Sequence, residues 1–104
     1  MKSTSGSRKL IVVSHSERLE NEAEAISSLF QMGLKNFHLR KPNWNIEEID
    51  QLLQEIPGKF YENIVLHSHY ELVRKYGLKG IHITQKTKKI GIEEKFKGYH
   101  TSIS

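Results

Sequence analysis

Residues 63–85, which read NIVLHSHYELVRKYGLKGIHITQ, carry the pattern that decides the fold. The apolar run 63–67 predicts a buried strand, and the run 80–84 predicts a second one. Between them, Ser68 and Glu71 have the spacing of a capping box, which predicts the start of a short helix. A strand, a helix and a strand joined by short connections form a right-handed crossover between parallel neighbours. The stretch therefore predicts an α/β fold with a parallel sheet.

Two more strand and helix pairs precede this stretch. Residues 9–14 predict a first strand covered on both faces, and residues 36–40 predict a second strand. A capping box follows each strand and predicts the start of a helix. The capping pairs are Ser14 with Glu17 and Asn45 with Glu48. Residues 98–104 predict the beginning of a fifth strand, so the alternation extends over the whole chain.

Length and composition set the limits of this fold. The 104 residues suffice for one ordinary domain, and we expect residues 1–8 to be a flexible leader before a single folded unit at 9–104. The formal net charge of +4 favours anionic partners. Without cysteine the chain has no disulfides and no thiolate metal site, and we expect a cytoplasmic protein. No apolar run approaches the roughly 18 residues of a membrane span, so no membrane partner is expected.

The histidines gather where a parallel α/β fold binds its ligands, at the carboxyl ends of the strands. All six lie in or just after a predicted strand: His15, His38, His67, His69, His82 and His100. A hydrogen-bonded histidine is also an ordinary way to end a strand, and this alternative stays open for each of them.

Arg40 is the most informative charged residue, because an arginine at the end of a buried strand is costly unless an anion compensates it. Its planar guanidinium suits a phosphate or a pyrophosphate. His38 points to the same side of a strand with a period of two residues, so the two side chains are expected to contact one ligand. The alternative is an ion pair between Arg40 and a nearby glutamate.

Other site chemistries have weaker support. His67 and His69, joined by His38 or His82, form a candidate set of three imidazoles for a divalent metal ion. The chain lacks the G-x-S-x-G, G-x-G-x-x-G and P-loop motifs. The densest group of positive charges reads as a solvated face without the interleaved aromatic residues of a nucleic-acid site. It consists of Lys86, Lys88, Lys89, Lys95 and Lys97.

Three ordered segments resemble one enzyme family. Residues 37–42, FHLRKP, resemble the "VQLREK" motif of thiamine phosphate synthases, also called thiamine phosphate pyrophosphorylases. Residues 64–73 are similar to their "IVNDRVDLA" segment, and residues 77–85 are similar to "GADGVHLGQ". The superfamily also includes thiazole tautomerases, which share the scaffold and differ in chemistry.

The resemblance implies the first half of a (β/α)₈ barrel, here truncated or naturally half-length. Its family reaction joins hydroxymethylpyrimidine pyrophosphate to a thiazole phosphate and releases pyrophosphate. The resemblance assigns substrate-binding positions to His38, Arg40, Lys41, His67 and Ser104. The two aspartates that hold magnesium in the family are replaced by Ser68 and Thr87, neither of which supplies a carboxylate ligand for the magnesium ion.

Two alternatives follow from these departures. One is a thiazole tautomerase-like protein in which histidines shuttle protons. The other is a half-barrel that binds phosphorylated ligands without catalysis. In either case we expect small phosphorylated pyrimidine and thiazole molecules as partners, and a homo-oligomer formed through the open edges of the sheet.

Overall fold

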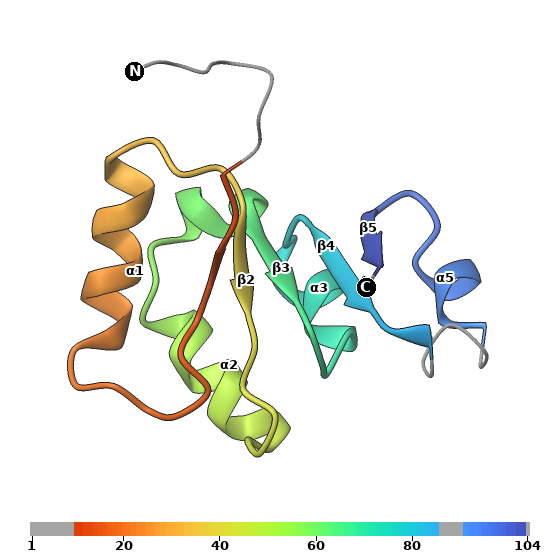
Figure 1. The fold of residues 1–104 in the computed structure, drawn as a ribbon, viewed down its shortest axis with the longest axis horizontal. Coiled ribbons are helices and arrows are strands. Elements are labelled where there is room, and N and C mark those ends of the chain that lie inside the picture. The colour runs from red at the N-terminus through yellow and green to blue at the C-terminus, as the bar shows by residue number, and fades with distance from the viewer. Residues whose placement is uncertain (1–9, 86–90, 104) are drawn as a thin grey trace.

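The computed structural model describes residues 10–85 and 91–103, and it shows five parallel strands with helices between them (Figure 1). The strands are β1 (Val12–Val13), β2 (Phe37–Leu39), β3 (Ile64–Leu66), β4 (Gly80–Ile83) and β5 (His100–Ile103). They lie in the order β1-β2-β3-β4-β5, and each neighbouring pair is parallel. The predicted α/β class and parallel sheet are confirmed.

Helices connect consecutive strands. They are α1 (Glu22–Gln31), α2 (Ile46–Gln54), the 3₁₀ helix η1 (Gly58–Asn63), α3 (Glu71–Tyr76) and α5 (Ile92–Lys95). A sequential strand order with crossovers of one hand places the connecting helices on one face of the sheet. Ile26 of α1, Leu53 of α2 and Val73 of α3 accordingly share one buried core. Within the described ranges, no helix combines the length and the apolar character needed to cross a membrane.

The sheet separates its side chains by type, because successive strand residues point to opposite faces. The face against the helices is apolar and consists of Phe37, Leu39, Ile64, Leu66, Ile81 and Ile83. The alternate residues form the other face, which we call the histidine face. It includes His38, Val65, His67, Gly80, His82, His100 and Ser102. The strand period therefore collects the polar residues on the side away from the helices.

Two of the three predicted capping boxes are wrong. Ser14 does not cap a helix: its Oγ accepts a hydrogen bond from the Arg40 N–H at 2.9 Å and donates to the Arg40 carbonyl at 3.1 Å. Helix α1 begins only at Glu22, after Asn21, whose side chain makes no capping bond. Ser68 also caps nothing, since the residue before α3 is Tyr70, again without a capping bond.

The third capping box is confirmed. Asn45 Oδ1 accepts from the Glu48 N–H, and Glu48 Oε1 accepts from the Asn45 N–H, both at 2.9 Å. These two bonds satisfy backbone donors at the start of α2 that have no partner within the helix.

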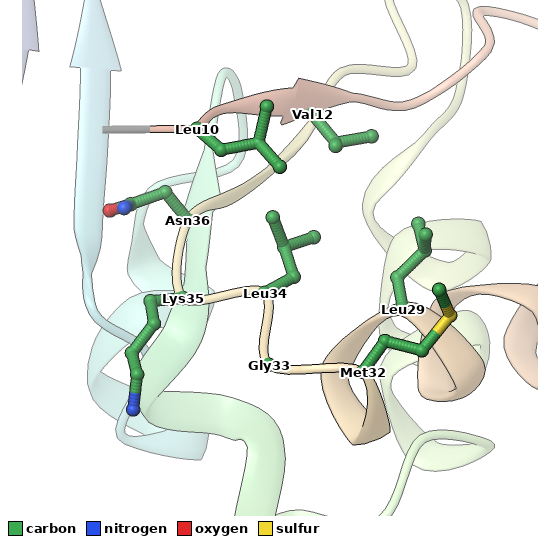
Figure 2. A pocket seen from close by; sticks show the side chains of 8 residues that line it. All are labelled: Leu10, Val12, Leu29, Met32, Gly33, Leu34, Lys35 and Asn36. Atoms are coloured by element: carbon green, nitrogen blue, oxygen red, sulfur yellow. The ribbon is translucent and has the colours of Figure 1, made fainter. Parts of the chain in front are cut away.

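Strand β1 is shorter and more exposed than predicted. It covers two residues, and the exposed fraction of Val13 is 49%. The prediction of a strand covered on both faces is wrong, because the side chains of Ile11 and Val13 are exposed. Within residues 10–85 and 91–103, β1 pairs only with β2 and forms an edge of the sheet. Beside it, at the amino ends of the strands, an apolar groove of about 510 Å³ lies between Leu10, Val12 and the end of α1 near Met32 (Figure 2). This groove is at the opposite end of the sheet from the carboxyl ends of the strands.

Gly80 permits the close approach of β4 and β5. A Cβ atom built at this position would overlap the backbone carbonyl of His100 on the neighbouring strand. We expect Gly80→Ala to lower the free energy of unfolding by about 2 kcal/mol or more, because backbone atoms cannot move aside cheaply. Urea denaturation measures the change. Gly77→Ala is the matched control: a Cβ there meets no atom within 4 Å, and its φ of +69° predicts a loss of about 1 kcal/mol. Equal losses in the two variants would contradict the packing argument.

Candidate functional site

Three imidazoles meet on the histidine face. His38 Nδ1 and His67 Nε2 lie 2.8 Å apart in a hydrogen bond, and the rings of His67 and His82 stack with their centroids 4.2 Å apart. His82 Nδ1 hydrogen-bonds Ser102 Oγ at 2.7 Å. The cluster therefore links β2, the end of β3, β4 and β5 in one continuous row.

The strand register brings these residues together. His82 pairs directly with Ser102 across β4 and β5. Leu39 pairs with Leu66, so the next residues, Arg40 and His67, lie opposite each other at the carboxyl ends of β2 and β3. In parallel α/β folds this end of the sheet is where ligands bind.

Burial keeps the histidine cluster neutral near pH 7. Burial, followed by the charge of His82, lowers the pKa of His38 from 6.5 to about 4. The same two causes lower the pKa of His67 to about 3, with a smaller contribution from Arg40. Burial also lowers the pKa of His82. In a neutral imidazole one ring nitrogen donates a hydrogen bond, and the other accepts one or binds a metal ion.

Arg40 adds a permanent positive charge to the carboxyl end of the cluster. Its side chain is exposed, and it acts electrostatically on His67. Its backbone is fixed by the two hydrogen bonds with Ser14. The alternative of an Arg40–glutamate ion pair finds no support among the described residues, where the ion pairs join Arg18 with Glu48, Lys41 with Glu22, and Lys75 with Asp50.

Lys41 lies apart from the histidines although it follows Arg40 directly. Its side chain is fully buried, and its Nζ donates to Glu22 Oε2 at 2.5 Å and to the carbonyls of His15 and Glu17 at 2.7 Å each. These three acceptors occupy the three protons of the ammonium group. These bonds of Lys41 hold the connection between β1 and α1 against the end of β2.

The H-x-H pair is split by the structure. His69 has a left-handed backbone with φ of 51°, and its Nε2 hydrogen-bonds the Trp44 carbonyl at 2.9 Å. The three clustered imidazoles are instead His38, His67 and His82, one ring nitrogen of each lying within 4.8 Å of the others. Sequence spacing did not identify this set, because its members lie in or directly after three different strands. The register of those strands is what brings the three histidines together.

Some predicted positions lie outside the described residues. Ser104, Thr87 and the lysines at 86, 88 and 89 are among them. Of the described members of the substrate-binding set, His38 and His67 lie on the histidine face, and Arg40 lies beside His67 at the carboxyl end of the sheet.

Comparison with solved structures gives one informative similarity. A crystal structure of thiamine phosphate pyrophosphorylase from Bacteroides thetaiotaomicron matches the chain with a TM-score of 0.72 and 27% identity. This similarity supports the superfamily suggested by the motifs. The match covers 93% of this chain and 58% of that one, so the chain spans less than two thirds of that protein's length. No family model and no curated protein matches the chain.

The described residues do not fit the magnesium ion that the superfamily resemblance implies. Magnesium prefers carboxylate and water oxygens in octahedral geometry. Ser68 stands where a ligating aspartate is expected, and the only aspartate of the chain, Asp50, lies in α2 and pairs with Lys75. Imidazole nitrogens dominate this end of the sheet, and they suit other metals.

The lowered pKa values predict that metal-free protein loses stability in acid. Below pH 6.5 the unfolded histidines take up protons that the native cluster resists, so the free energy of unfolding falls as the pH falls toward 4. We expect a loss of about 2 kcal/mol between pH 7 and pH 5 from His38 and His67 together, allowing for solvent screening of the partly exposed His67. Urea denaturation of chelator-treated protein at both pH values measures it. A His38→Gln, His67→Gln double variant should show a flatter profile; the same loss in both proteins would refute the assignment.

Removal of one partner of the buried Lys41–Glu22 pair is expected to lower the free energy of unfolding strongly. Lys41→Met should lower the free energy of unfolding by about 3–5 kcal/mol, because it leaves Glu22 buried without its partner. The double variant Glu22→Leu, Lys41→Met should lose less than Lys41→Met alone, since no uncompensated charge remains. Lys75→Met, which breaks the solvent-accessible pair with Asp50, should cost much less. Chemical denaturation ranks the variants, and a Lys41→Met protein as stable as Lys75→Met would contradict this account.

Proposed function

We propose that the chain binds a phosphorylated precursor of thiamine on its histidine face, as a thiamine phosphate synthase-like protein. The observation that carries the proposal is Arg40 beside His67 at the carboxyl end of a sheet similar to that of a thiamine phosphate pyrophosphorylase. We further propose that the five sequential parallel strands correspond to the first half of a (β/α)₈ barrel, in which this face points inward.

Arg40 is the anion-binding group of the proposed site. A guanidinium presents several N–H donors in a plane and binds phosphate or pyrophosphate oxygens through two parallel hydrogen bonds. Its exposure leaves the group accessible to a ligand, and the bonds of its backbone to Ser14 hold its position. Lys41, whose Nζ is occupied by three acceptors, supports this position from the buried side.

The neutral histidines supply hydrogen bonds and proton transfer rather than positive charge. The His38–His67 hydrogen bond connects two groups that each hold or pass a proton. This observation favours the second candidate function, a thiazole tautomerase-like proton transfer on a bound phosphorylated thiazole. A synthase reaction instead requires positive charge in the site, because the charge of the departing pyrophosphate must be neutralised. Among the described residues of this site, Arg40 is the permanent cation that supports it.

Ligand titration tests the role of Arg40. Calorimetry with pyrophosphate, and separately with thiazole phosphate, should show binding that weakens at least about tenfold in Arg40→Ala, a loss of about 1.4 kcal/mol. Arg74→Ala is the matched control, since Arg74 is an exposed arginine of α3 that bonds the Lys95 carbonyl. Equal binding by wild type and Arg40→Ala would remove Arg40 from the site.

Incubation of the protein with hydroxymethylpyrimidine pyrophosphate and thiazole phosphate distinguishes the candidate activities. Formation of thiamine phosphate supports the synthase-like reaction. Isomerisation of the thiazole phosphate, followed by NMR, supports the tautomerase-like reaction. Retained phosphate binding without either product would identify a non-catalytic binding protein.

A further inference from the structure

We propose that His38, His67 and His82 bind one transition-metal ion of the zinc type, with a fourth coordination position that accepts an oxygen atom of an anionic ligand near Arg40. This metal differs in its ligands and chemistry from the carboxylate-bound magnesium that the described residues do not fit.

The geometry needs only local adjustment to hold the ion. Three histidines bind zinc at about 2.0–2.1 Å each, which in a tetrahedral site separates the nitrogens by about 3.4 Å. His38 Nδ1 and His67 Nε2 lie 2.8 Å apart, and one nitrogen of each ring of the cluster lies within 4.8 Å of the others. One nitrogen pair is closer than the required separation and the distances within the set do not exceed 4.8 Å, so ring rotations of small amplitude bring the nitrogens to it.

Donor chemistry selects the class of metal. A set of three imidazoles suits zinc, copper, nickel and cobalt and is a poor site for magnesium, which prefers oxygen. His38 is buried and comes from the centre of β2, and His82 comes from the interior of β4. Ligands on strands keep their positions better than ligands on loops.

Ser102 holds one of the ligands in place. Metal-bound histidines usually hydrogen-bond a second group through the other ring nitrogen, which fixes the ring orientation. His82 Nδ1 has such a bond to Ser102 Oγ at 2.7 Å, which leaves Nε2 of the same ring as its metal ligand. The structure thus provides an outer partner before any metal binds.

The surroundings of the cluster favour an anion as the fourth ligand. Arg40 acts on His67, and Lys79 and His100 act on His38. The positive charges of these groups favour an anion over water beside a bound cation, and three protein ligands leave one tetrahedral position for it. This fourth ligand rests on the proposed function, whereas metal binding by the three histidines does not.

Cobalt is the probe for the metal site. We would titrate untagged, chelator-treated full chain with Co²⁺ and follow the visible bands of tetrahedral cobalt, and then displace it with Zn²⁺. The expected result is one ion per chain and no displacement by Mg²⁺. His82→Ala should weaken binding at least about a hundredfold, and Ser102→Ala about tenfold. His15→Ala, an exposed histidine outside the cluster, should bind as wild type.

The controls keep the two proposals separate. Circular dichroism establishes that each variant is folded, and Ser102→Ala gives a second reading if His82→Ala is unfolded. Binding of less than one ion per chain, or equal affinity in wild type and Ser102→Ala, would overturn the metal site. Tighter pyrophosphate binding by the zinc-loaded protein supports the fourth-ligand position, and unchanged binding refutes it. If cobalt binds as expected while neither form binds pyrophosphate, the proposed function fails and the metal site stands.

Discussion

The sequential order of five parallel strands is the constraint on which the rest of the structure depends. Crossovers of one hand place α1, α2 and α3 on the same side of the sheet, so that among the described residues one face receives the apolar helical cover. The alternation of strand residues then assigns every second side chain to the other face. Leu39 and Ile81 lie in the core that the described helices share, whereas His38 and His82 lie on the opposite face of the sheet. The histidine cluster is therefore a product of topology, assembled from residues that are far apart in the sequence.

The side chains of the histidine cluster are stable on this face because hydrogen bonds connect them. A buried polar group without a partner costs several times what a hydrogen bond contributes, so such groups occur in connected sets. His38 bonds His67, His82 bonds Ser102, and the His82 carbonyl accepts from the Tyr70 hydroxyl at 2.8 Å. Next to Arg40 in the sequence, Lys41 pairs with Glu22 and donates to two backbone carbonyls, and these bonds fix the connection between β1 and α1. These bonds leave the Arg40 side chain as the exposed, positively charged group on a rigid support.

The sequence predicted the elements well and their ends less well. Strands of consecutive apolar residues such as Ile64–Leu66 were predictable because burial on both faces leaves a clear signal. The Asn45 capping box was also predictable, since its bonds are local, while Ser14 has the same spacing and bonds Arg40, 26 residues away. Tertiary contacts therefore decide whether a serine or asparagine with this spacing caps a helix or bonds a distant residue. The role of Lys41 shows the same limit, because nothing in its neighbours along the chain indicates that Glu22 lies within 2.5 Å.

A site made of one guanidinium and three neutral imidazoles differs from a carboxylate site in how metal and anion depend on each other. Aspartates attract a hard cation before any phosphate arrives, whereas imidazoles contribute no charge, and the positive neighbours of His38 and His67 oppose a bare cation. An anion on Arg40 removes this repulsion, and a metal ion on the histidines adds an electrophile for the same anion. Linkage requires that each raise the affinity for the other by the same factor. A site of this kind, with imidazoles and without aspartates, thus favours binding of the metal ion and the anion as a unit over metal binding followed by ligand binding.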